Sequence, residues 1–397
     1  MKGFIKSTLL VTAFILIGIT VKVFSADSLA EQFGIKFKGG ITTVVQDSPK
    51  ENITNDVEGA SAGVYLVDLT LERNFEHNGK IVVQLKGGRG KGLNDKIETY
   101  AIVNAVSDPS LNDAADTLAK FTKAYYQQSI LDDKLTIDFG KLNFNSFFAS
   151  NKYSNDSDSQ FITSIFTGDK IAETPPQRLG LALAYDIAKN FKVTYAYFSQ
   201  DIDHVDSSGV NTVQLAYSPS NRCNLLFYAW GNNKNHYSIA DPNIKSGIYG
   251  FGISVDHELI DNVGIFVGTS YKDPSVSVLK SSTSAITPSE MKLQPFASWD
   301  AGLQISGNIW SRPTDVVGFA IGQMYTSEYY TKHNKHHLDY NYNDGAETEM
   351  EIYYNFGLKK YNIAITPAVQ YFINPKGGNA VVKDNIVVAG IRTRVVF

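Results

Sequence analysis

The chain has 397 residues, a formal net charge of −4 and 43% hydrophobic residues, with a mean hydropathy of −0.15. That hydropathy excludes a bundle of transmembrane helices, and the negative charge disfavours nucleic acid as a partner. The single cysteine, Cys223, excludes an internal disulfide bond and a cysteine-based metal cluster. Tyrosine (22) and phenylalanine (23) are abundant, which suits aromatic belts at two membrane interfaces and equally the core of a soluble β-sandwich.

Residues 1–26 have the features of a cleaved signal peptide. Two lysines form a positive end, and Thr8 to Val21 is an apolar run too short to span a bilayer comfortably. The small residues that follow favour cleavage after Ser25 or Ala26, with a retained anchor helix as the alternative. We therefore expect export, with residues 27–397 forming one mature domain.

Alternation of apolar and polar residues recurs along the mature chain and predicts β-strands, because successive side chains of a strand point to opposite faces. The predicted strands are 65–72, 80–86, 134–139, 179–185, 192–200, 213–217, 251–255, 263–267, 301–305, 317–321, 349–358, 362–374 and 387–397. After the signal peptide no apolar run is long enough for a transmembrane helix.

Short connections alternate with long polar ones. The short connections include 76–79, 188–190 and 260–262, and the long ones include 200–211, 231–247, 272–292 and 327–346. Asp108–Gln127 is different: apolar residues recur there at helical spacing and predict a short helix within a long loop. Asn145–Gln177 is another long stretch without clean alternation, and loops of this length are usually functional or disordered.

The final strand decides the expected architecture. One of its faces carries no charge, the other carries Arg392 and Arg394, and the chain ends at Phe397. An uncovered apolar edge would aggregate in water, so we expect this strand to pair with the first strand of the chain. The predicted fold class is all-β: a transmembrane antiparallel β-barrel of about 16 strands, with short periplasmic turns and long extracellular loops. Asn145–Gln177, and after it Asp108–Gln127, is expected to narrow the lumen.

Charged residues on the inner faces are the candidate substrate pathway. Glu349, Glu351 and Tyr353 share one face of their strand, and Arg392 and Arg394 share a face two strands on. Guanidinium donors, carboxylate acceptors and aromatic rings together suit a sugar, and opposed charges weigh against ions of one sign. The alternatives are a salt-bridge network that only keeps the wall wet and rigid, or positions on the exterior or in loops. Further lumen candidates are Gln370, Asp68, Glu72, Lys86, Asp138 and Lys141.

Three other motifs carry weaker signals. Gly87–Gly92 lacks the Gly-Lys-Ser/Thr end of a phosphate loop and indicates a flexible loop. His333, His336 and His337 lie among lysines, which disfavour a metal ion, and Asn155–Asp158 lacks the glycine and terminal glutamate of a calcium loop. Common hydrolase motifs are absent from the sequence. We therefore expect no metal, no cofactor and no enzyme activity, with a lipase-like barrel enzyme as a remote alternative.

Three groups of segments carry a family resemblance. They are Lys134–Asn143 with Phe147–Tyr153 and Gln160-Phe161; Trp299–Leu303 with Gly307, Asp315–Gly318 and Gly322; and Glu351–Tyr354 with Thr366–Tyr371, Asn374-Pro375 and Ile391–Phe397. These segments resemble the carbohydrate-selective porins (OprB-like) of Gram-negative outer membranes. The Thr-Pro-x-x-Gln-Tyr and Asn-Pro pair is the most specific part. The resemblance covers nearly the whole mature chain, although the centre from 201 to 292 matches only in rhythm.

The resemblance implies a 16-stranded outer-membrane barrel that passes neutral sugars by diffusion. The chain departs from the family pattern in having only seven arginines, where the family's sugar channels have an arginine-rich constriction. The expected partners are small sugars or other neutral solutes, outer-membrane lipid, and the barrel assembly machinery, which would engage the C-terminal Phe397; a homotrimer is compatible with this. The alternative function is a structural or adhesion barrel of the outer membrane with a blocked lumen.

Overall fold

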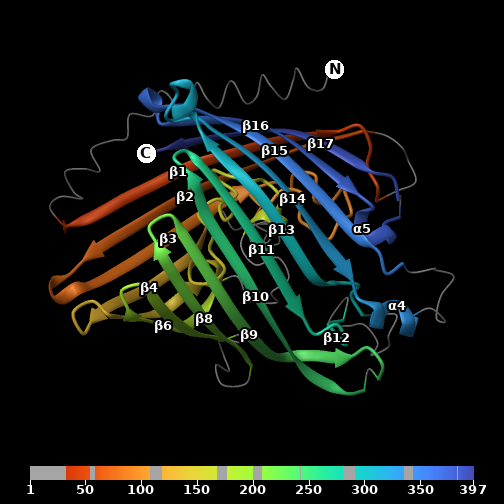
Figure 1. Cartoon of the computed structure of the whole chain (residues 1–397), viewed down its shortest axis with the longest axis horizontal. Coiled ribbons are helices and arrows are strands. Elements are labelled where there is room, and N and C mark those ends of the chain that lie inside the picture. Colours follow the sequence, from red (N-terminus) through yellow and green to blue (C-terminus); the bar gives the residue numbers. More distant parts are fainter. Residues whose placement is uncertain are drawn as a thin grey trace.

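The computed structural model describes most of the mature chain. The described residues are 33–53, 59–107, 119–167, 177–199, 208–241, 243–279, 291–334, 343–381 and 383–397. Within them, sixteen long strands form a closed antiparallel barrel (Figure 1), so the predicted fold class is confirmed. The predicted signal peptide, residues 1–26, lies outside the described residues.

The strands follow one another around the wall in chain order. They are β1 (Ile35–Ser48), β2 (Ala60–Asn74), β3 (Gly79–Arg89), β4 (Lys120–Ile130), β5 (Leu135–Asn143), β6 (Gln177–Ala188), β7 (Phe191–Ser199), β8 (Gly209–Ser220), β9 (Cys223–Ser238), β10 (Lys245–Ile260), β11 (Val263–Lys272), β13 (Pro295–Ser306), β14 (Val316–Thr326), β15 (Ala346–Leu358), β16 (Ile363–Ile373) and β17 (Ile386–Val396). The two-residue strand β12 (Val276–Ser277) pairs with the end of β9.

The helices of the described residues are short. They are α4 (Glu328–Asn334), α5 (Pro375–Gly378) and the 3₁₀ turns η1 (Glu76–Asn78), η2 (Phe144–Ser146), η3 (Ser164–Phe166), η5 (Gly307–Trp310) and η6 (Lys359–Tyr361). None of the helices in these ranges has the length and apolar character needed to cross a membrane.

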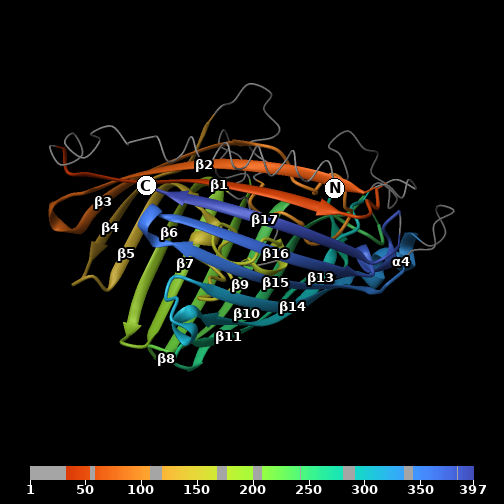
Figure 2. The ribbon, with the colours of Figure 1, turned by 90° about the horizontal axis from the view of Figure 1, so that it is seen from above.

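The barrel closes between its first and last strands, as predicted. The register of β1 and β17 runs from Gly40 opposite Val396 to Asp47 opposite Ala389. Beyond it, Gly39 and Phe397 exchange backbone hydrogen bonds of 2.9 and 3.0 Å. Figure 2 shows β1 and β17 side by side along this seam. Because the two edges pair with each other, neither presents a free row of N–H and C=O groups.

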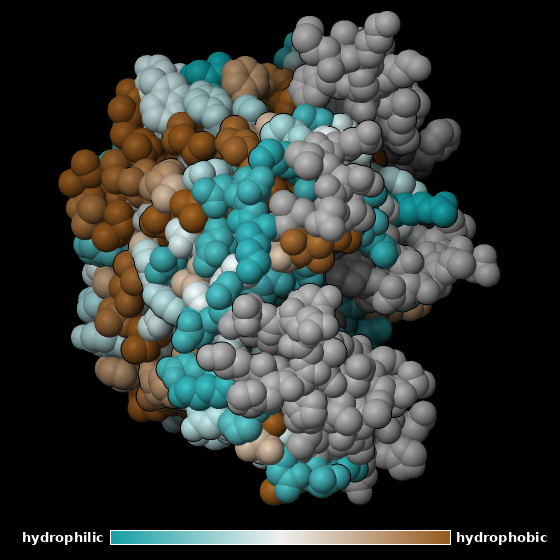
Figure 3. Space-filling view, turned by 90° about the vertical axis from the view of Figure 1, so that its right-hand side faces the viewer, coloured by the Kyte–Doolittle hydropathy of each residue, from teal (hydrophilic) through white to brown (hydrophobic). Residues whose placement is uncertain are grey.

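Alternation along each strand separates an apolar outer wall from a mixed inner wall. On β15 and β16, Ile352 and Val369 face outward and are 50% and 46% exposed, whereas Glu351 and Gln370 face inward and are buried. Viewed from the end that carries α4 and α5, hydrophobic side chains gather along one side and hydrophilic ones cover the middle of that end (Figure 3). This is the arrangement that a bilayer requires of a barrel.

Every strand predicted from alternation coincides with an observed one, but β1, β4 and β9 were not predicted. The predicted helix Asp108–Gln127 is wrong from Lys120 onward, where β4 begins; residues 108–118 lie outside the described part. The expected long loop 231–247 is also wrong, because β9 continues to Ser238 and β10 starts at Lys245. The short connections between β2 and β3, β6 and β7, and β10 and β11 are confirmed.

Two loops fold into the barrel and form most of its core. We call residues 90–107 the first lumen loop and residues 144–167 the second lumen loop. Figures 1 and 2 show these orange and yellow segments within the ring of strands. Phe161, Ile165 and Phe166 of the second loop pack with Val106 of the first loop and with inner-wall residues such as Met324. Residues 145–167 of the segment Asn145–Gln177, predicted to narrow the lumen, thus lie inside it, and residues 168–176 lie outside the described part. The second predicted segment, Asp108–Gln127, instead forms part of the wall from Lys120 onward.

Candidate functional site: the lumen loops and the inner wall

Strand β15 presents three glutamates to the inside of the barrel, two residues apart. Glu347, Glu349 and Glu351 are each at most 1% exposed. Glu347 accepts the backbone N–H groups of Tyr100 (2.8 and 3.0 Å) and Ala101 (3.1 Å) in the first lumen loop. A carboxylate that accepts two backbone N–H groups makes strong, charge-assisted hydrogen bonds, so Glu347 anchors this loop to the wall.

Glu351 does the same for the second lumen loop. Its two oxygens accept the N–H groups of Ile162 (2.7 Å) and Thr163 (3.0 Å). Glu349 stands between the two anchors, and both of its oxygens are buried without a hydrogen-bond partner. One strand therefore holds both loops, and a buried carboxyl group without a partner lies between the two attachments.

Amide side chains join the same two loops to the seam of the barrel. Gln46 of β1 donates to the side-chain oxygen of Gln370 on β16 (3.3 Å) and accepts from Asn104 of the first lumen loop (3.0 Å). Gln370 donates to the carbonyl of Val103 (2.9 Å) and to Glu351 (3.3 Å). The predicted candidate Gln370 thus faces inward, but it lies beneath the first lumen loop.

The two predicted arginines of β17 also contact the second lumen loop. Arg392 is 1% exposed, and its Nη1 donates to the carbonyls of Ser157 (2.8 Å) and Gln160 (2.7 Å). Arg394 lies 3.2 Å from Asp68 of β2 and 3.1 Å from Asp158 of the loop. Both guanidinium groups therefore bind loop backbone or carboxylates.

Tyr353 completes this group of predicted residues. Its side chain is 2% exposed, its hydroxyl accepts a hydrogen bond from Gln304 (2.5 Å), and its ring meets Phe161 of the second lumen loop edge-on at 5.0 Å. The structure brings Glu349, Glu351, Tyr353, Gln370, Arg392 and Arg394 together on β15–β17, on the inner wall as expected. The loops cover these residues, and their observed contacts are with the loops and with other residues of the wall. Contact with a passing solute stays a prediction.

The remaining predicted residues lie on β2, β3 and β5. Asp68 faces inward and stands opposite Lys86 in the register of β2 and β3. Glu72 accepts Lys38 of β1 at 3.2 Å, and Asp138 accepts Gln127 of β4 at 2.8 Å. These four therefore line the inner wall; Asp68, Glu72 and Asp138 do so as ion-paired or hydrogen-bonded groups, and Lys86 stands opposite Asp68.

Lys141 does not lie on that wall. Phe139, 59% exposed on the outer face, is two residues before it, and Lys141 stands opposite Leu179 in the outward row of β6. Its predicted place in the lumen is wrong. Lys141 lies three positions after the inward-facing Asp138, and because side chains alternate between the two faces, an odd offset puts it on the outer face.

An open cavity of about 690 Å³ lies elsewhere in the barrel, against the inner wall of β6–β10. We call it the vestibule; the second lumen loop forms one side of it through Ser146, Ser150, Asn151 and Lys152. Opposite charges pair along it: Lys192 with Asp186 (3.4 Å), and Lys152 with the neighbouring Glu258 (3.3 Å). Asn224 donates to Asp256 at 2.8 Å. These polar groups surround a space large enough for a small solute.

The sequence analysis named none of the wall residues of the vestibule as lumen candidates, although the loop side of the vestibule lies within the predicted segment Asn145–Gln177. The signal was present as inward polar positions on alternating strands, such as Asp186 and Asp256. It was missed because such positions occur all around a barrel, and the choice among them depends on which part of the wall the loops cover.

Comparison with protein-family models decides the family. The model described as "Carbohydrate-selective porin, OprB family" matches residues 63–224 and 228–397. The chain belongs to this family. It is accordingly an outer-membrane channel of the porin type, and the resemblance drawn from the sequence is confirmed. A comparison with curated proteins found no match.

Solved porin structures share the fold of this OprB-family chain at low sequence identity. The high-pH structure of Pseudomonas putida OprB matches with a TM-score of 0.76 and 16% identity, over 94% of this chain and 96% of that one. An anion-selective porin from Comamonas acidovorans gives 0.58 at 9% identity, over 91% and 99%. The outer-membrane channel DcaP of Acinetobacter baumannii gives 0.56 at 12% identity, over 91% and 97%. These likenesses support the barrel fold.

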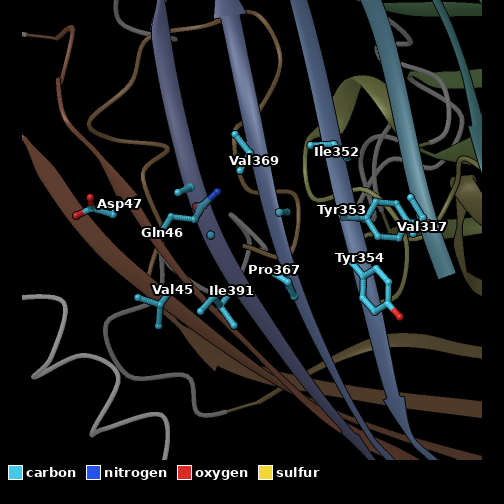
Figure 4. A pocket seen from close by; sticks show the side chains of 13 residues that line it. Val45, Gln46, Asp47, Val317, Ile352, Tyr353, Tyr354, Pro367, Val369 and Ile391 are labelled. Atoms are coloured by element: carbon cyan, nitrogen blue, oxygen red, sulfur yellow. The ribbon is translucent and has the colours of Figure 1, made fainter. Parts of the chain in front are cut away.

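The outer wall of this OprB-family barrel is hollowed across the closing seam. A hollow of about 580 Å³ runs over β14–β17 and β1, where Val45, Ile391, Pro367 and Tyr354 border it (Figure 4). Its lining is apolar, as lipid chains or an apolar face of another copy would require.

Proposed function

We propose that this porin lets small neutral solutes, chiefly carbohydrates, diffuse passively across the outer membrane. The observation that carries the proposal is the vestibule, in which Lys152 and Lys192 each pair with a carboxylate and Asp256 accepts an amide, while Lys189 adds one further cation. A sugar exchanges hydrogen bonds with water for hydrogen bonds with such groups, while the pairing of most of the charges reduces the field that would favour ions of one sign. The family's description as carbohydrate-selective supports the same solute class.

Passive diffusion assigns no residue a catalytic role and requires no cofactor. The lumen loops reduce the free cross-section, and the polar side chains of the remaining path offer donors and acceptors that bind weakly and release quickly. Homotrimer formation and recognition of Phe397 by the barrel assembly machinery belong to the same proposal. The outer-wall hollow supports the first, and the aromatic Phe397, which pairs with Gly39 at the closing seam, supports the second.

Liposome swelling tests the solute class. Purified barrel is reconstituted and the swelling rates are compared for neutral sugars of increasing size and for organic acid anions of matched size. We expect the sugars to enter faster than the anions at each size. Equal or faster entry of the anions would overturn the proposed selectivity.

Matched variants test the vestibule itself. Lys192→Gln leaves Asp186 without its cation, so the reversal potential in a salt gradient should shift toward cation preference, by about twofold in the permeability ratio. The double variant Asp186→Asn/Lys192→Gln removes the charges together and should keep the wild-type ratio. A single variant that behaves like the wild type would remove this wall from the solute path.

A structural or adhesion barrel with a blocked lumen is the second candidate, and the dense packing of both lumen loops favours it. Planar-bilayer conductance separates the two candidates. A folded, purified barrel that never opens supports the blocked barrel, whereas stable conductance steps support the channel.

A further inference from the structure

Two neighbouring short turns form a pocket at the end of the barrel opposite α4 and α5. Ser311–Thr314, between β13 and β14, and Gly357–Tyr361, between β15 and β16, line a cavity of about 320 Å³. The hydroxyl of Thr314 donates to the carbonyl of Gly357 at 2.9 Å and ties the two turns together. We call this cavity the turn pocket.

Arg312 is held at the edge of the turn pocket in a fixed orientation. Its Nε donates to Asp315 at 2.5 Å, and its guanidinium carbon lies 4.2 Å from the ring centroid of Phe356. Asp315 also accepts the hydroxyl of Tyr354 (2.5 Å) and the N–H of Gly357 (3.1 Å). The side chain of Arg312 remains 42% exposed, so part of its donor fork stays open to a ligand.

Lys359 and Lys360 add two positive charges that no carboxylate balances. Both are exposed, and in the described part of the chain neither forms a salt bridge; Lys360 lies 5.4 Å from the ring centroid of Tyr361. At two other turns of this end, acidic residues offset the basic ones: Arg222 pairs with Asp261, and Lys134 follows Asp132 and Asp133 directly. Compared with those two turns, the turn pocket carries a surplus of positive charge.

Aromatic side chains place the turn pocket at the membrane interface. Trp310 donates to the hydroxyl of Tyr354 at 3.2 Å, and Tyr361 is 53% exposed beside the pocket. Tyrosine and tryptophan gather at the level of lipid headgroups, and the short turns of such barrels lie on the periplasmic side. The cations of the pocket therefore lie at the depth of the phosphates of the periplasmic leaflet.

We propose that the turn pocket binds the phosphodiester headgroup of an anionic glycerophospholipid in the periplasmic leaflet. Lys359 and Lys360 supply point charges, the free part of the Arg312 fork supplies directed donors, and the aromatic rings pack against the glycerol and the first methylene groups. The inference depends on the position of the barrel in the membrane and not on which solute it passes.

Native mass spectrometry of the full mature barrel, released from detergent, tests this. The probes are phosphatidylglycerol and phosphatidylcholine with identical acyl chains. Wild-type barrel should retain phosphatidylglycerol preferentially. Lys359→Gln/Lys360→Gln should weaken its binding about 30-fold, because each basic residue near an anionic headgroup contributes ~1 kcal/mol, a factor of about five.

The charge-matched control is Lys36→Gln/Lys134→Gln, which removes two exposed lysines from the same end of the barrel. Its affinity for phosphatidylglycerol should stay within about twofold of that of the wild type. Heat-modifiable migration on gels checks that each variant is folded. Equal binding by the wild type and Lys359→Gln/Lys360→Gln, or an equal loss in the control, would overturn the proposal. Displacement of the lipid by soluble glycerol phosphate at equal concentration would show a phosphate site without lipid preference, and would overturn it as well.

Discussion

Glu349 and Glu351 lie on the same face of β15, two residues apart, and have opposite surroundings. Glu351 accepts two loop N–H groups, whereas both oxygens of Glu349 are buried without a partner. A buried polar group stabilises a fold only when its hydrogen bonds are satisfied, and it destabilises the fold when they are not. The two residues therefore form a matched pair for measuring how strongly the second lumen loop is anchored.

Glu351→Gln should destabilise the barrel by about 1–3 kcal/mol, because an amide replaces one acceptor oxygen with a donor that faces the N–H groups of Ile162 and Thr163. Glu349→Gln should leave the stability unchanged or raise it, since no hydrogen bond is lost. Urea unfolding in detergent micelles measures both. Equal effects of the two substitutions would contradict the anchoring role of Glu351.

Asp315 makes the stability of the folded barrel depend on pH at the end that carries the short turns. Burial raises the pKa of its carboxyl, but hydrogen bonds from Arg312, Tyr354 and the N–H of Gly357 outweigh burial and hold the pKa below its ordinary 3.8. The folded state therefore favours the ionised form. Its contribution to stability is complete above the unfolded pKa and is lost as the pH falls through the lower, folded pKa.

Asp315→Asn should remove this contribution, so the wild type should lose its stability advantage over the variant between about pH 4 and pH 2. Acid unfolding followed by intrinsic tryptophan fluorescence compares the two proteins. A constant difference in stability from pH 7 to pH 2 would show that the carboxylate charge has no such role.

At the scale of elements, alternation predicted the strands whose inner faces are polar, including β15–β17 beneath the lumen loops, and failed where the inner face is apolar because it packs against a lumen loop. Tyr228 and Trp230 of β9 face inward and pack in one cluster with the second lumen loop, and Leu226 on the same face is buried, so both faces of that strand are apolar. Val44 of β1 is buried against the loops in the same way. In β4 a register shift opposite Gln84 and Leu85 interrupts the alternation itself. A single sequence does not reveal which loop folds inward onto which strand.

The same coverage limited the prediction of the site. Inward orientation followed from period two and was correct for Arg392 and Glu351, but wrong for Lys141. Burial under a loop depends on contacts between residues far apart in the chain, such as that of Glu351 with Ile162. The vestibule is the part of the lumen that the two loops leave open once those contacts have formed. Its location therefore depends on the tertiary structure.

Docking of the second lumen loop also depends on a glycine of β11. A Cβ added to Gly264 would overlap the ring of Tyr153. Gly264→Ala should therefore displace this ring, destabilise the barrel by about 1–3 kcal/mol and increase cleavage of the loop by trypsin at Lys152. Gly231→Ala is the control, because nothing lies within 4 Å of the added atom. Equal protease resistance of both variants would contradict the packing argument.

At the scale of the whole molecule, export to the outer membrane leads to a prediction about the N-terminus of the mature protein. We propose that the signal peptide is removed on export by cleavage after Ser25 or Ala26, so that the purified outer-membrane protein begins at Ala26 or Asp27. Intact-mass measurement of protein extracted from outer membranes checks this. A mass that includes Met1 would instead support the retained anchor helix.

The double attachment to β15 has a mechanical consequence. Glu347 holds the first lumen loop and Glu351 holds the second, and Glu349 is the single inward-facing position between them. A shift of this strand along the wall would carry the two obstructions in the same direction and by the same amount. We therefore expect the two lumen loops to move together, so that both change the width of the opening at the same time.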